Sequence, residues 1–196
     1  FDFGGNMSTF EKKFGKYAVS NLSVILIMCY AVGYIIELIN SDFLLMLTLD
    51  PYAILHGQVW RLVTWIVVPP ASLDFFTIIM LYFYYSVGRT LEHTWGDYRY
   101  NVYLFSGMLF TIIASFVCMG LCYLMYGEVF ASPEQAEAIF LAGSTIFSTY
   151  YINMSILLAF ASTFPNSMVL LMFIIPVKMK WLGIIYGVLL GVQFIT

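Results

Sequence analysis

Five long apolar segments constrain the fold of this chain more than any other feature. They lie near residues 19–39, 73–88, 101–126, 138–163 and 181–196. A helix needs about 20 apolar residues to cross the hydrocarbon core of a bilayer, so the second and fifth segments depend on tilt or local thinning of the membrane. Charged residues make up 10% of the chain, against about a quarter in soluble proteins. The sequence therefore predicts an all-α integral membrane protein, with a cytoplasmic segment over 1–18 and one transmembrane domain over 19–196.

The basic residues predict the orientation of these segments in the membrane. If all five segments cross, seven of the eight basic residues share one side, and only Arg61 lies on the other. The seven are Lys12, Lys13, Lys16, Arg89, Arg99, Lys178 and Lys180. Basic residues concentrate in cytoplasmic loops. The N-terminus is therefore predicted to be cytoplasmic.

Charge and metal-binding residues exclude several classes of function. A net charge of -3 is too small to indicate a nucleic-acid partner or a polybasic lipid site. The cysteines, Cys29, Cys118 and Cys122, all fall in apolar segments, where they are typical small core residues. His56 and His93 have no cysteine or carboxylate at ligand spacing. We therefore expect no metal site and no cofactor.

The connection between the first two segments, residues 40–72, is too apolar for a solvated linker. It is also too interrupted, by Asp50-Pro51 and Pro69-Pro70, to form another span. Its apolar runs are flanked by Trp60 and Trp65, and tryptophan prefers the headgroup region. We expect this loop to lie in the membrane interface on the external side.

Within this loop, Trp60-Arg61 allows two interpretations. An arginine at membrane depth is costly unless the protein itself satisfies its donors, which would make Arg61 a structural clamp or a site residue. Alternatively, Arg61 snorkels to the headgroups beside an aromatic anchor. The sequence leaves both interpretations open.

Three motifs, in order, resemble the rhomboid superfamily, which includes the rhomboid proteases and the inactive derlins. The first is QVWRLVT over residues 58–64, in the external loop. The second is GRTLE at 88–92 followed by WGDYRY at 95–100, which looks like the end of the superfamily's second helix and its turn into the third. The third, FPN at 164–166 and IPVKMKWL at 175–182, resembles the link from the fourth helix to the fifth. The resemblance implies a rhomboid-like helical bundle.

The second motif supplies the structural residues Gly88, Glu92, Gly96 and Arg99. Glu92 lies close in sequence to three basic side chains, where a carboxylate could satisfy basic groups and loop amides at the cytoplasmic interface. We interpret Glu92 as a polar staple that fixes how the second helix meets the third.

The catalytic positions depart from the protease pattern. A rhomboid protease needs a serine in a Gly-x-Ser-Gly motif at the start of helix four, and that motif is absent here. Spacing from Phe164-Pro165 places Tyr150-Tyr151 where the serine should be. Spacing from Glu92 places Phe76 and Met80 where the family carries a histidine and an asparagine, and neither can donate a hydrogen bond to an oxyanion.

Ser144, within LAGSTIF at 141–147, is the fallback nucleophile. It would require about two extra helical turns before Phe164, and a base. Neither histidine supplies that base, because His93 belongs to the cytoplasmic turn and His56 to the external loop. The structural interpretation of Ser144 is a helix-four hydroxyl that bonds its own backbone or a neighbouring helix.

The last segment carries Gly183, Gly187 and Gly191 at four-residue spacing, a pattern that lets helices approach closely. The resemblance implies a sixth helix after residue 196, where a protease would carry its histidine.

The sequence therefore predicts a rhomboid-like membrane protein without proteolytic activity, which binds transmembrane segments of other membrane proteins within the lipid bilayer, as derlins are understood to do. The alternative is a divergent intramembrane serine protease that uses Ser144 and a histidine beyond residue 196. A transporter is disfavoured, because no segment carries a charge near its middle.

Overall fold

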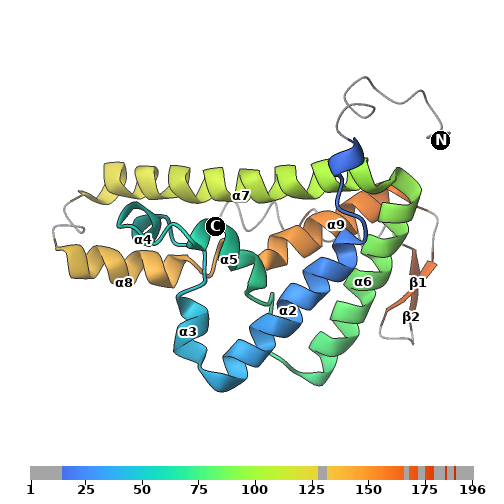
Figure 1. Ribbon diagram of the computed structural model, residues 1–196, viewed down its shortest axis with the longest axis horizontal. Helices are drawn as coiled ribbons and strands as arrows, with labels where there is room; N and C mark the ends of the chain where they lie inside the picture. The colour runs from blue at the N-terminus through green and yellow to red at the C-terminus, as the bar shows by residue number, and fades with distance from the viewer. Residues whose placement is uncertain are drawn as a thin grey trace. The chain divides into compact units, whose positions relative to one another are not determined.

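The computed structural model describes residues 15–127, 132–165, 168–171, 175–178, 184 and 188, and these are mostly helical. Figure 1 shows its helices and strands coloured by residue number. The chain divides into two compact units. Unit 1 comprises Phe1–Val24, Leu73–Leu104 and Asn153–Thr196, and unit 2 comprises Ile25–Ser72 and Phe105–Ile152. Three long helices pass from one unit into the other: α2 (Leu22–Ile39), α7 (Asp97–Tyr126) and α9 (Thr149–Thr163).

Unit 1 is built on α6 (Phe75–Trp95), together with the first turn of α2, the first two turns of α7 and most of α9. The short 3-10 helix η1 (Gly15–Tyr17) precedes α2. The Asp74 side chain begins α6 by accepting the Thr77 amide at 2.6 Å, as an N-cap residue does. Gly96 ends α6 with φ +81°, a conformation that glycine adopts without a steric penalty.

After α9, unit 1 contains a short antiparallel hairpin. Strands β1 (Met168–Leu171) and β2 (Ile175–Lys178) pair so that Met168 lies opposite Lys178 and Leu171 opposite Ile175. Residues 164–182 were expected to link two helices, and the described part of that link is extended backbone, not helix.

Unit 2 contains the loop between the first two apolar segments, folded into four short helical pieces. They are α3 (Ser41–Leu45), α4 (Pro51–Leu55), α5 (Arg61–Thr64) and the 3-10 helix η2 (Trp65–Val67). Asn40 and Asp50 cap α3 and α4 by accepting two backbone amides each. The loop is therefore an ordered structure with its own backbone and capping hydrogen bonds.

The other elements of unit 2 are the rest of α7 and helix α8 (Pro133–Gly143), capped by Ser132. Helix α4 packs on α8 (Figure 1). Phe140 of α8 is buried and stacks between Tyr52 of α4 and Tyr123 of α7, with ring centroids 5.7 and 5.6 Å away. Phe140 forms one buried apolar cluster with Met119 and Ala136, and Tyr52 packs against this cluster.

Two helical stretches of the described residues, Gly15–Ile39 and Asp97–Met125, are long and apolar enough to cross a membrane. They agree with the first and third predicted segments. The second predicted segment lies in α6, which extends seven residues further and becomes polar in its last two turns, around Arg89 and Glu92. The fifth segment, with Gly183, Gly187 and Gly191, lies outside the described residues apart from 184 and 188.

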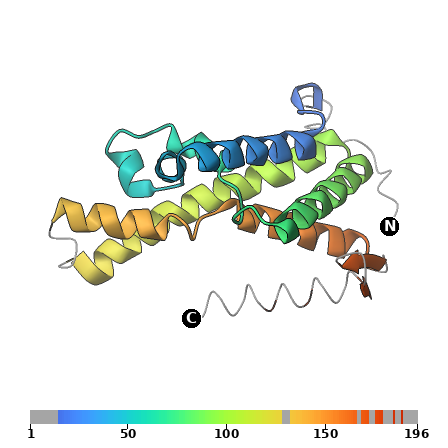
Figure 2. The ribbon, with the colours of Figure 1, turned by 90° about the horizontal axis from the view of Figure 1, so that it is seen from below.

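The prediction of one helix over residues 138–163 is wrong. Helix α8 ends at Gly143, α9 begins at Thr149, and the chain between them is irregular (Figure 2). The hydroxyls of Ser144 and Thr145 bond back to the carbonyls of Leu141 and Ala142. Serine and threonine compete in this way with the helical hydrogen bonds, and mean hydropathy does not register this competition.

Candidate functional site

Arg61 is the centre of the most connected polar cluster in unit 2. It is the first residue of α5, and only 4% of its surface is exposed. Its Nε donates to Gln58 Oε1 at 2.7 Å. Its Nη1 donates to Leu45 O, Thr48 O and Thr48 Oγ1 at 3.1, 3.2 and 3.3 Å. One guanidinium thus bonds the end of α3 at Leu45, the following turn at Thr48, and Gln58 just before α5. The clamp interpretation requires bonds of this kind.

Two opposing electrostatic effects act on the buried charge of Arg61. Desolvation lowers the pKa of the guanidinium, because burial disfavours the charged form. The negative charges of Asp50 and Glu137 raise it. Both carboxylates lie in unit 2, on either side of the α4–α8 contact. The arginine is therefore held by neutral acceptors at short range and by two carboxylates through their field.

Trp60, the neighbour of Arg61, has half of its surface exposed. Trp65 is instead fully buried, with its Nε1 donating to Leu62 O at 3.2 Å. Of the two tryptophans expected at the interface, the exposure of Trp60 fits that location, while Trp65 is a core side chain of the loop.

A cavity of about 210 Å³ adjoins this cluster within unit 2. The loop contributes one wall, which includes Leu45, Thr48 and Trp65, and the Pro69-Pro70 segment contributes another. The irregular chain between α8 and α9 closes it with residues 144–148 except Ile146. The walls are mainly hydrocarbon, and the lining residues that carry hydroxyl groups are Thr48, Ser144, Thr145 and Ser148.

Ser144, the fallback nucleophile, is 2% exposed and lies at the edge of this cavity. Its Oγ lies 2.7 Å from Leu141 O and 3.0 Å from Thr48 Oγ1. Both partners are neutral, and neither can act as a general base. His56 lies at the exposed end of α4, with its Nδ1 2.8 Å from Tyr52 O. The described residues thus give Ser144 no activating partner.

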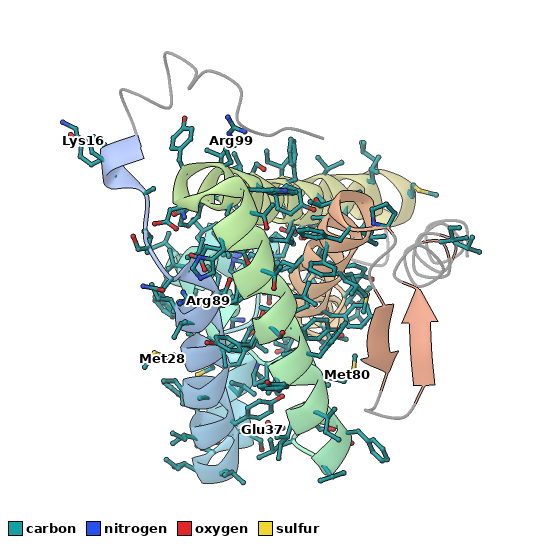
Figure 3. All side chains as sticks on the ribbon, turned by 90° about the vertical axis from the view of Figure 1, so that its right-hand side faces the viewer. Lys16, Met28, Glu37, Met80, Arg89 and Arg99 are labelled. Atoms are coloured by element: carbon teal, nitrogen blue, oxygen red, sulfur yellow. The ribbon has the colours of Figure 1, made fainter. Side chains whose placement is uncertain are left out.

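Glu92 is the centre of a second polar cluster, in unit 1, and it is 2% exposed. Its Oε1 accepts the backbone amide of Leu22, the first residue of α2, at 2.6 Å. Its Oε2 lies 4.0 Å from Arg89 Nη1, and Arg89 also bonds the Asn21 side chain. Figure 3 labels Arg89 beside the N-terminal end of α2. A carboxylate at a helix N-terminus accepts a hydrogen bond from an otherwise unpaired amide, and its negative charge interacts favourably with the positive end of the helix dipole.

Glu92 does join two helices, but they are not the pair that the sequence analysis predicted. Glu92 was expected to fix the second helix to the third, and its hydrogen bond goes to the start of the first helix, α2. The contact of α7 with the same segment is made by Asn101, whose side chain donates to Val19 O at 2.8 Å and accepts from Val19 N at 3.0 Å. Ser23 and Tyr100 add a hydroxyl pair at 3.0 Å.

Sequence reasoning missed Asn21, Ser23, Tyr100 and Asn101. They could have been noticed as hydrogen-bonding residues at the ends of apolar segments, where backbone groups remain unpaired. Gly88, which was singled out, lies against this network. A Cβ atom there would lie 2.8 Å from the Tyr100 hydroxyl and 2.9 Å from Ser23 Oγ.

The other residues that the sequence analysis singled out lie away from the centres of the Arg61 and Glu92 clusters. Gly96 serves as the C-cap of α6, and Arg99, half-buried in the first turn of α7, lies apart from Arg89 in Figure 3. Tyr150 and Tyr151 follow the first residue of α9, with their rings edge to face at 5.6 Å. Within the described part of the chain, no group of three or more His, Cys, Asp or Glu residues could hold a metal ion.

Comparison with known proteins gives one match. A family model described as "Eukaryotic integral membrane protein (DUF1751)" matches residues 20–196. No curated protein matches the chain, and no solved structure does.

Proposed function

The chain belongs to the DUF1751 family of eukaryotic integral membrane proteins, and on that premise we propose that it is a rhomboid-like membrane protein without proteolytic activity. In this proposal α2, α6, α7 and α9 are the counterparts of the first four rhomboid helices. The three sequence motifs support it, as do the hydrogen bonds of Arg61 and Glu92, each of which holds a part of the chain that the motifs include.

The start of α9 is the observation that carries the proposal. The rhomboid serine lies at the start of helix four, and here α9 begins Thr149-Tyr150-Tyr151. The Thr149 hydroxyl donates to Val68 O at 2.7 Å, and the side chain is fully buried. Its hydroxyl is committed to a structural hydrogen bond, and the hydroxyl of Ser148, just before the helix, has no hydrogen-bonded base among the described residues.

We further propose that the protein binds transmembrane segments of other membrane proteins. Phe76 and Met80 replace polar residues on α6, and Phe76 is 56% exposed. An apolar face favours packing of a second apolar helix through van der Waals contact, without groups that would polarise a peptide carbonyl. Recognition without hydrolysis is the chemistry that these substitutions support.

The absence of proteolysis is tested with the full chain in detergent or liposomes. We expect no labelling by a fluorophosphonate probe and no cleavage of model rhomboid substrates, because a nucleophile without a base stays protonated. An active rhomboid protease in the same preparation is the positive control. Labelling that disappears in Ser144→Ala would refute the proposal and establish the serine protease alternative.

Binding is tested with a photo-crosslinking amino acid at Phe76 in native membranes. We expect crosslinks to transmembrane segments of other proteins, identified by mass spectrometry. The same probe at Phe110 of α7, which is 68% exposed, is the matched control for general membrane contacts. Equal protein crosslinking from the two positions would contradict a binding face on α6.

A further inference from the structure

The cavity in unit 2 is too small for a whole cofactor or drug-sized ligand. Its volume is about 210 Å³, and pockets for such ligands start at roughly 300 Å³. Its walls are mostly the hydrocarbon of Leu44, Leu49, Trp65 and Val68. A space of this size and lining accommodates part of a single hydrocarbon chain, which gains van der Waals contact by filling an otherwise empty apolar void.

One edge of the cavity is polar, and it carries unused hydrogen-bond donors. Phe147 and Ser148 line the cavity from the segment between α8 and α9. Within the described chain, neither of their backbone amides donates to a partner, and the Ser148 hydroxyl has no partner either. Thr48 is different, because its hydroxyl donates to Leu45 O and accepts from Arg61. Both residues that carry these unpaired donors line the cavity, so they offer partners to an acceptor oxygen there.

The cavity also adjoins side chains suited to contact with lipid. Leu45 lines it and is 41% exposed. The neighbouring Phe43 and Met46, in and just after α3, are each at least half exposed. In an integral membrane protein, exposed apolar side chains next to a partly open apolar cavity place lipid hydrocarbon at its entrance.

We propose that this cavity binds one ester-linked acyl chain of a membrane lipid. The hydrocarbon packs between the α3 segment and the Pro69-Pro70 segment. The ester carbonyl accepts hydrogen bonds from the donors of Phe147 and Ser148. The site differs from the face of α6 proposed for transmembrane partners, and it requires no proteolytic chemistry.

The test uses the full chain in nanodiscs that contain a phosphatidylcholine with a photoreactive diazirine in one acyl chain. We expect crosslinks to peptides that include residues 44–49 or 144–148. Val68→Phe fills the cavity and should reduce this labelling roughly tenfold, the equivalent of losing a few buried methylene groups. Val63→Phe is the matched control, because Val63 is 70% exposed and does not line the cavity.

A second variant tests the cavity from its other side, and a second lipid tests the role of the ester carbonyl. Ser148→Leu obstructs the opposite wall and removes a donor, so it should reduce labelling even if Val68→Phe fails to fold. An ether-linked analogue lacks the carbonyl and should label the same peptides several-fold less. Labelling of these peptides that is unchanged in a folded filling variant would overturn the site. Equal labelling by ester and ether lipids would overturn the role of the carbonyl.

Discussion

At the scale of single residues, Arg61 shows why a charged group persists in an apolar loop. Its four acceptor atoms are two backbone carbonyls, a hydroxyl and a side-chain amide. A planar guanidinium reaches them together, whereas a lysine ammonium is a compact point charge. Arg61 holds the loop together because the shape of its guanidinium matches several acceptors at once. A positive charge without that shape would not make all of these hydrogen bonds.

Arg61→Lys should therefore lower stability in detergent by about 2–4 kcal/mol, the usual effect of disrupting a buried charged hydrogen-bond network. Thermal unfolding followed by tryptophan fluorescence measures the loss. Lys16→Arg is the control, because Lys16 is exposed and exposed substitutions usually change stability by less than about 0.5 kcal/mol. A melting temperature unchanged by Arg61→Lys would favour the snorkelling interpretation.

Gly33 provides a second test at this scale. A Cβ atom there would lie 2.0 Å from Val67 O and 2.8 Å from the Pro69 ring. Gly33→Ala should therefore force α2 away from the η2–Pro69 segment and destabilise unit 2 by about 1–3 kcal/mol. Gly107→Ala in α7 meets nothing within 4 Å and should be neutral or stabilising, since alanine favours a helix. Similar melting temperatures for the two variants would contradict the close approach at Gly33.

At the scale of elements, hydrogen bonds from side chain to backbone join helices that hydropathy alone treats as independent. Glu92 binds the first amide of α2, and Asn101 binds both backbone groups of Val19. In unit 1 these contacts fix the start of α2 against α6 and α7. The position of α2 relative to α6 and α7 therefore depends on a few polar groups at the helix ends as well as on apolar packing.

Glu92→Ala should destabilise the protein by about 1–3 kcal/mol, because a buried amide at the start of α2 loses its acceptor. Glu92→Gln keeps an acceptor oxygen and should cost less, with the remaining loss due to the absent charge at the helix N-terminus. Glu134→Gln, on the exposed first turn of α8, is the matched control. If Glu92→Ala and Glu134→Gln unfold at the same temperature as the wild-type chain, Glu92 is not a staple.

At the scale of the whole molecule, the distribution of basic residues predicts a cytoplasmic N-terminus. Single cysteines at Thr94 and Val59, both exposed, would test it in a chain without Cys29, Cys118 and Cys122. An impermeant thiol reagent applied to the non-cytoplasmic face should label Val59→Cys and leave Thr94→Cys unlabelled. The reverse pattern would invert the predicted topology.

The sequence predicted the parts of this molecule that depend on apolar length and on the cost of burying charge. It predicted two candidate spans and the membrane class, because both follow from transfer free energies of the residues themselves. It left the burial of Arg61 open between a clamp and a snorkelling side chain. It did not predict the break between α8 and α9, since the break depends on local hydrogen bonds from serine and threonine hydroxyls to backbone carbonyls. It also missed the partner of Glu92, because that partner is a backbone amide 70 residues away.

The interruption after Gly143 has a consequence for the lipid around the chain. Helix α9 has 15 residues and rises about 22 Å, whereas the 29-residue apolar stretch of α7 rises about 43 Å. A uniform hydrocarbon core of about 30 Å matches neither length. If both helices cross the bilayer, as the rhomboid-like proposal requires, the membrane is compressed at α9 and α7 is tilted. On that proposal the elastic energy of the deformed lipid adds to the free energy of unfolding, beside the internal contacts of the protein.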